Sequence, residues 1–136
     1  MSNVIKLTRR QLVRGHEGSM GPGELDVTAK SAGGWAASLA PTWAMVMSYR
    51  RGQMPEALFV KGYQDLLYRA FERRAALYVN MLGACSGGSG GSGEVAFLCY
   101  CPDGVFCHTH VLIDFIVGWR GDVFMDGRLE DERAYY

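Results

Sequence analysis

Glu-Val-Ala-Phe-Leu-Cys-Tyr, at residues 94–100, is the stretch that decides the fold. The run is almost entirely apolar, which is typical of a central strand covered on both faces. A Pro-Asp-Gly turn follows at 102–104, and residues 107–118 predict a mostly buried helix that ends at Gly118. Strands that alternate with helices in this way are typical of α/β proteins with a parallel sheet.

The rest of the chain supplies further elements for such a sheet. Alternating apolar and polar residues predict three more short strands, at 3–8, 25–30 and 122–125. Helices are predicted at 42–51 and 55–82, each beginning beside a proline. Residues 86–93 contain only serine and glycine, which predicts a flexible loop. We therefore expect a single α/β domain over residues 1–136, a compact Rossmann-like sandwich with a small, mainly parallel sheet flanked by helices.

Charge and cysteine content exclude several classes of protein. The 136 residues carry 14 Lys and Arg against 14 Asp and Glu, so the formal net charge is zero. This balance provides no general basic field for non-specific nucleic-acid binding. The first ten residues lack the plan of a signal peptide, and no apolar run approaches the ~18 residues that would span a membrane. We therefore expect a cytoplasmic protein with no membrane segment, whose four cysteines are free thiols.

Thiol and imidazole side chains lie on both sides of the predicted turn. Cys99 and Cys101 lie at the carboxyl end of the central strand, and alternation puts them on the same side of it. Cys107, His108 and His110 begin the helix that follows. Ligands of open parallel sheets bind beyond the carboxyl ends of the strands, and a helix N-terminus attracts anions. The same helix field and a neighbouring imidazolium lower the pKa of a cysteine, which favours a reactive thiolate.

These considerations divide the five residues into two groups. Cys101, Cys107 and His108 are the candidate catalytic residues. Cys99 and His110 are candidates for binding the ligand. Cysteine is among the residue types most often buried, so Cys99 also has a simple alternative role as a core residue.

Two other kinds of site fit this pattern less well. The cysteines and histidines are competent zinc ligands, but C-x-C-x5-C-H-x-H is not a usual zinc spacing, and we assign neither a metal nor a cofactor. Phosphatases with a cysteine nucleophile place it after a strand, followed by five residues and an arginine that binds the phosphate. Here five residues follow Cys101, but the next residue is Cys107. The arginine that this chemistry needs is missing at that position.

Three residues upstream are further candidates for ligand binding. Lys30 ends a predicted strand and would suit a phosphate, although a charged residue there is also explained by exposure to solvent. Thr42 and Trp43 begin a predicted helix, where the hydroxyl would form a wall of the pocket and the indole would stack on a base. The alternative is that Trp43 anchors the core and Thr42 is an ordinary residue of the first helical turn.

At this point the chain resembles a known family. Residues 97–101, Phe-Leu-Cys-Tyr-Cys, and 106–108, Phe-Cys-His, resemble the C-terminal signature of domain of unknown function 488, a family of short α/β domains from bacteria and often phages. Residues 25–31, 40–43 and the long helix with Tyr63 are similar to its phage-type branch, so the resemblance covers roughly residues 24–120. It implies a Rossmann-like fold with a site at the carboxyl edge of the sheet, but it implies no particular reaction.

The chain departs from this family at one position. Relatives usually carry arginine directly after the cysteine–histidine pair, and this chain has Thr109 there. If that arginine normally holds an anion, another group must replace it in this protein. His110, Lys30 and the arginines of the predicted helices are the candidates.

Three functions from different classes remain open. The first is binding of a nucleotide-type or other small anionic ligand at residues 99–110, with Cys101 or Cys107 reacting as a thiolate. The second is a non-catalytic phage protein that sequesters a host nucleotide signal in the host cytoplasm, as a homo-oligomer with pockets shared between subunits. The third is a structural metal-binding or partner-binding module.

Overall fold

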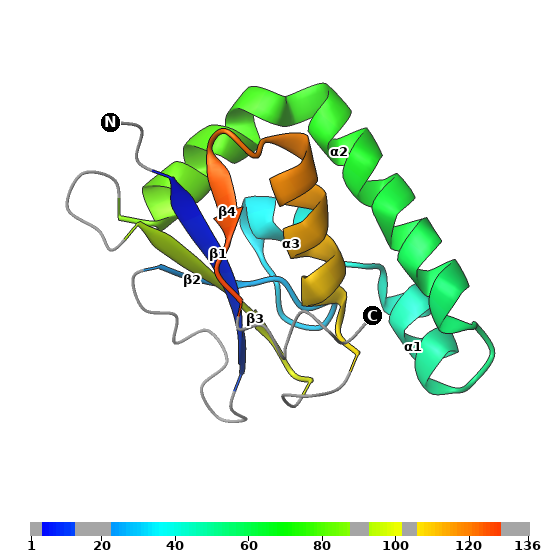
Figure 1. Ribbon diagram of the computed structural model, residues 1–136. Helices are drawn as coiled ribbons and strands as arrows, with labels where there is room; N and C mark the ends of the chain where they lie inside the picture. The colour runs from blue at the N-terminus through cyan, green and yellow to red at the C-terminus, as the bar shows by residue number, and fades with distance from the viewer. Residues whose placement is uncertain (1–3, 13–22, 88–92, 102–105, 129–136) are drawn as a thin grey trace.

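The computed structural model describes residues 4–12, 23–87, 93–101 and 106–128 (Figure 1). The strands are β1 (Ile5–Gln11), β2 (Glu24–Asp26), β3 (Glu94–Cys99) and β4 (Phe124–Asp126). The helices are the 3-10 helix η1 (Gly34–Leu39), α1 (Trp43–Arg50), α2 (Glu56–Cys85) and α3 (His108–Trp119).

The strands form one small parallel sheet. Their order is β2-β3-β1-β4, and each neighbouring pair is parallel. β1 and β3 form the centre and pair from Lys6 opposite Glu94 to Gln11 opposite Cys99. Because the strands run in the same direction, their carboxyl ends lie at one edge of the sheet. The parallel sheet with its helices confirms the predicted α/β fold.

The hydrophobic core lies between the sheet and the helices. Alternate residues of β1 and β3 face this core, among them Leu7, Val95 and Phe97, which are fully buried. α3 packs against β1, β3 and β4, and α2 packs against α3. Figure 1 shows α2 arching around the outer side of α3. Burying apolar side chains of this size contributes about 1.5–3 kcal/mol each, so this packing holds the start of α3 close to the carboxyl edge of the sheet.

α2 is a helix of 30 residues that covers the predicted span 55–82 and continues to Cys85. One residue in every four along its first half is apolar and buried, as expected of an amphipathic helix: Phe59, Tyr63, Leu67 and Phe71. The helix bends at Arg74, where φ is −135° and ψ is 37°. Buried residues on both sides of this bend belong to the same core.

β2 is shorter than the predicted strand 25–30. The carboxylate of Asp26 accepts hydrogen bonds from the backbone N–H of Thr28 at 2.9 Å and its hydroxyl at 2.8 Å. The hydroxyl of Ser31 also donates to this carboxylate. Local bonds of this kind compete with the strand ladder and turn the chain. Lys30 therefore lies in a turn beyond the strand and not at the end of it.

The other predicted elements are present with shifted bounds, and η1 was not predicted. Two predicted features lie partly or wholly outside the described residues: the turn at 102–104 and the Ser/Gly segment 86–93, of which 88–92 are not described. Among the described helices, none combines the length and the apolar character needed to cross a membrane.

Candidate functional site

Three thiols meet at the carboxyl edge of the sheet. Cys99 ends β3, Cys101 follows two residues later, and Cys107 is the N-cap residue of α3. Their sulfur atoms all lie within 4.8 Å of one another. Cys99 and Cys107 are buried, whereas Cys101 is partly exposed. The structure thus brings together the three cysteines that the sequence places around the predicted turn.

Cys107 has the strongest thiolate character of the described thiols. Burial raises the pKa of this thiol, but hydrogen bonds from the side chains of Cys101, Cys99 and Thr109 and from the backbone of Thr109 outweigh it and hold the pKa well below its usual value. The Thr109 hydroxyl donates to the sulfur at 3.2 Å. The pKa of Cys101 is raised, because its thiol donates hydrogen bonds to the sulfurs of Cys107 and Cys99. These hydrogen bonds therefore favour the thiolate form of Cys107 and the protonated form of Cys101.

His108 faces this thiolate with its unprotonated nitrogen. Its Nε2 lies 2.8 Å from the carbonyl oxygen of Val27, which can only accept, so Nε2 carries the proton. Its Nδ1 lies 3.9 Å from the sulfur of Cys107. Burial lowers the pKa of His108, which keeps the ring neutral near pH 7. A neutral imidazole in this orientation can accept a proton from Cys107 when that residue is in its thiol form, and it has no proton on Nδ1 to donate to the thiolate.

Arg9 is a component of the site that the sequence analysis missed. Its guanidinium is buried and donates to the sulfur of Cys99 at 2.9 Å, to the carbonyl of Cys101 at 2.8 Å and to the hydroxyl of Thr109 at 3.2 Å. It therefore joins the end of β3 to the first turn of α3. Strand alternation was the available signal, because Arg9 lies on the same face of β1 as Leu7, which faces the core.

A cavity of about 280 Å³ opens beside the thiols. Cys101, Cys107 and His108 form one part of its lining, and the cationic side chains of Lys30 and Arg50 form another. The remaining wall is largely aromatic and comes from α1, α2 and the residues next to the thiols: Trp43, Tyr49, Phe59, Tyr100 and Phe106. The ammonium of Lys30 lies 5.5 Å from the ring centre of Tyr100, within cation–π range.

Some of the remaining candidate residues line the cavity and others do not. Lys30 and Trp43 line the cavity, and Trp43 is half exposed there, at 51%, instead of anchoring the core. Thr42 is not among the lining residues; it caps α1 by accepting a hydrogen bond from the backbone N–H of Met45 at 3.1 Å. Cys99 lies behind the two cavity-lining thiols, held by Arg9.

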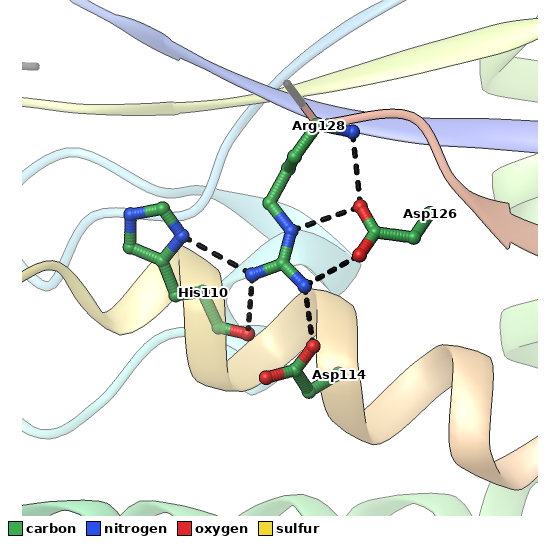
Figure 2. Close-up of polar contacts among 4 residues, drawn as sticks. All are labelled: His110, Asp114, Asp126 and Arg128. Carbon is green, nitrogen blue, oxygen red and sulfur yellow. Dashed lines mark hydrogen bonds and ion pairs between the residues drawn. The ribbon is translucent and has the colours of Figure 1, made fainter. Parts of the chain in front are cut away.

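His110 points to a different neighbour, Arg128 (Figure 2). The guanidinium of Arg128 donates to Nδ1 of His110 at 3.1 Å and to both carboxylate oxygens of Asp126, and it also pairs with Asp114. Since Nδ1 accepts from Arg128, the ring proton of His110 is on Nε2. His110 is thus part of a buried polar cluster that ties the end of β4 to α3, and it does not line the cavity.

The carboxyl-edge thiols lie within the span matched by a known family. A family model described as the active DUF488-N3 subclade, DUF488-N3a, matches residues 8–119. The chain belongs to this DUF488 family. Searches of curated proteins and of solved structures found no significant match. The resemblance seen in residues 97–101 and 106–108 is thereby confirmed.

Thr109, in the first turn of α3, contacts Arg9. At Thr109, where the family resemblance led us to expect an arginine, the chain has a hydroxyl, and the guanidinium of Arg9 on β1 donates to it at 3.2 Å. A buried guanidinium is therefore present beside the first turn of α3, but it belongs to Arg9 on β1 and not to a residue of the helix. Its Nε donates to Thr109, and one terminal nitrogen donates to both Cys99 and Cys101, so Arg9 positions the thiols.

The thiol cluster is also the described group best suited to a soft metal ion. Three thiolates with sulfurs this close match the ligand type and number of a partial zinc site. Arg9, however, places a positive charge 2.9 Å from one of those sulfurs. That charge opposes the binding of a metal ion at the same sulfurs, because two positive charges repel each other.

Proposed function

We propose that this protein binds a small anionic ligand of the nucleotide type in the cavity beside α3, and that the Cys107–Cys101 thiols react with it. The observation that carries the proposal is the lining of the cavity. One part has two thiols and a neutral histidine, a second has two cationic side chains, and a third has aromatic rings. Each part has a distinct chemical use, and together they fit a ligand with an anionic group and a flat apolar part.

The cations supply the anion-binding part. Lys30 and Arg50 approach the cavity from the turn after β2 and from the end of α1. The N-terminus of α3, which has twelve residues, adds the partial positive charge of unpaired backbone N–H groups. Both contributions favour a phosphate or carboxylate group close to the thiols.

The aromatic wall supplies the part that would hold a base or another flat group. Tyr49 and Phe106 have ring centres 5.4 Å apart, and Phe59 and Phe106 meet edge to face at 5.7 Å. These contacts fix the rings before a ligand enters, which reduces the entropy cost of binding. A cavity of about 280 Å³ restricts the ligand to roughly the size of a mononucleotide.

The thiol part would act through Cys107. Its lowered pKa favours the thiolate, and the unprotonated Nδ1 of His108, 3.9 Å from the sulfur, can accept the proton of any Cys107 that is still in the thiol form. Cysteine thiolates of this kind attack electrophilic centres. Free thiols in this arrangement also suit a reducing compartment such as the cytoplasm.

The near-complete burial of Cys107, at 1% exposure, favours a second candidate, binding without reaction. In that case the protein sequesters its nucleotide-type ligand, the function expected of a phage protein that removes a host signal. A ligand that co-purifies and is recovered unchanged after heat denaturation supports sequestration. Recovery of a cleaved or altered product supports the reactive site.

Competitive alkylation tests the proposal directly. The reduced full chain is treated with iodoacetamide at neutral pH, and peptide-resolved mass spectrometry follows each cysteine. We expect the Cys101 and Cys107 peptides together to react at least about tenfold faster than Cys85, whose pKa is raised by burial. Adenosine monophosphate should slow the pocket thiols and leave Cys85 unaffected. Equal rates at all thiols, with no protection by the nucleotide, would overturn the proposal.

A matched pair of variants tests the role of the cations. Arg50→Gln should weaken protection by adenosine monophosphate, because Arg50 lines the cavity. Arg51→Gln removes the same charge from the next residue, which is exposed and not among the lining residues, and should keep protection unchanged. An equal effect of the two substitutions would mean that overall charge, not the cavity, governs the protection.

A further inference from the structure

The two cavity-lining thiols have a use beyond ligand binding. We propose that Cys101 and Cys107 form a redox-active pair that reduces low-molecular-weight disulfides bearing anionic groups, with a Cys101–Cys107 disulfide as the protein product. The proposal rests on the proposed function in one respect, that the cavity admits an anionic ligand beside the thiols.

The geometry allows this bond with a small movement. The two sulfurs lie within 4.8 Å, so closing a disulfide requires them to approach by at most about 2–3 Å. Cys101 lies beyond the last paired residue of β3, so its side chain can turn without breaking the ladder with β1. Cys107 is the N-cap residue of α3. Its carbonyl accepts from the backbone N–H of His110 at 3.1 Å, but its side chain makes no capping bond, so the sulfur can turn without breaking the bonds of the helix.

Cys99 is a poor alternative partner. It is paired with Gln11 at the carboxyl end of the two central strands and is fully buried. Its sulfur is already engaged by the guanidinium of Arg9, and it is not among the residues that line the cavity. A disulfide substrate in the cavity would therefore meet Cys101 and Cys107 first.

The reaction balances with the substrate as oxidant. The Cys107 thiolate attacks one sulfur of R–S–S–R, forming a mixed disulfide and releasing RS⁻. Cys101 then attacks the Cys107 sulfur, the mixed disulfide breaks, and the second RS⁻ leaves with the proton that Cys101 gives up. The protein loses two electrons and the substrate gains them. A low-molecular-weight thiol reduces the Cys101–Cys107 bond to start another cycle.

The electrostatics of the cluster favour this order of events. Cys101 is held protonated while it donates to the Cys107 thiolate. Once Cys107 is in a mixed disulfide, its negative charge is gone, and that cause of the raised pKa of Cys101 is removed. The second thiol therefore becomes available only after the first has reacted, as a resolving cysteine requires.

Two disulfides of similar size and opposite charge test the inference. The reduced full chain is mixed with the dianion dithiodipropionate or with the dication cystamine, and intact mass and peptide mapping follow the products. We expect dithiodipropionate to react at least about tenfold faster, because Lys30 and Arg50 attract it and repel cystamine. The expected product has lost two hydrogens, carries no adduct and contains a Cys101–Cys107 bridge.

Variants separate the two steps. Cys101→Ser should stop at a stable mixed disulfide on Cys107, and Cys107→Ser should react at least about tenfold more slowly. Cys85→Ser is the control, because Cys85 lies at the far end of α2 and should not affect either step. Circular dichroism of each variant verifies that it is folded, and a variant that fails is replaced by the corresponding alanine substitution.

Three results would overturn the inference: a stable adduct on the unmodified chain, a bridge that includes Cys99, or equal rates with the two disulfides. These results leave the proposed function intact if adenosine monophosphate still protects the pocket thiols from alkylation. Loss of that protection and of preferential alkylation instead counts against the proposed function itself.

Discussion

Replacing Arg9 with methionine should destabilise the protein by removing the group that joins β3 to α3. The guanidinium donates to a sulfur, a carbonyl and a hydroxyl at 2.8–3.2 Å, and the residue is only 8% exposed. Methionine keeps much of the apolar stem, so lost packing is a small part of the effect.

The magnitude follows from two opposing terms. Hydrogen bonds from a charged donor contribute about 1.5–3 kcal/mol each, which suggests a large loss for three of them. Removing a buried charge also removes its desolvation penalty of several kcal/mol. We therefore expect the free energy of unfolding to fall by about 2–4 kcal/mol, a substantial share of the 5–15 kcal/mol typical of a domain.

Arg10→Met is the matched control for this experiment. Arg10 is the next residue of β1, with a side chain 57% exposed and a single surface ion pair to Glu24 at 2.6 Å. Its replacement should cost about 0.2–1 kcal/mol. Urea unfolding of both variants, monitored by circular dichroism, measures the two changes against the parent chain. A loss at Arg9 no larger than that at Arg10 would refute the role given to the buried guanidinium.

Three further predictions concern other parts of the chain. Alkylation of Cys107 should reach half its maximal rate at a lower pH than alkylation of Cys85, because burial raises both pKa values but hydrogen bonds to the Cys107 sulfur more than reverse the increase there. A pH series with peptide-resolved mass spectrometry measures both midpoints, and coincident midpoints would contradict the prediction. Arg128→Leu should lower the free energy of unfolding by about 2–4 kcal/mol, since its side chain is 2% exposed and pairs with two carboxylates, while Arg120→Leu, in an exposed pair, should have little effect in the same urea titration. Gly127→Ala should cost about 1–3 kcal/mol, because the added Cβ would lie 2.9–3.3 Å from atoms of β1; an unchanged thermal midpoint would show that the strand yields.

Much of the fold was predictable from local patterns. The apolar run 94–100 indicated the central strand, and residues spaced four apart indicated the long helix, because each pattern reports directly which face of an element is buried. The gathering of Cys99, Cys101 and Cys107 was predictable for a related reason. The three cysteines lie within nine residues of one another along the chain, so they have little freedom to separate.

Other features of the site were not predictable because they depend on long-range contacts. Nothing near Arg9 in the sequence indicates that its guanidinium reaches Thr109, one hundred positions away. The direction of His110 was equally open, since only the tertiary arrangement places Arg128 against it (Figure 2). Each residue along a helix turns by about 100°, so His108 and His110, two positions apart, point to nearly opposite sides of α3 and have different neighbours.

The sequence by itself determined the strand and the helix that flank the thiols, because burial and backbone geometry act over a few neighbouring residues. The tertiary structure alone decided which charges surround those thiols. It placed Arg9 against the sulfur of Cys99, and it placed Lys30 and Arg50 in the wall of the cavity that the other two thiols line. Local sequence does not report these neighbours, because electrostatic interactions depend on distance in space and not on separation along the chain. The same arrangement directs hydrogen bonds to the sulfur of Cys107 and lowers its pKa, which makes this group of thiols a candidate reactive site.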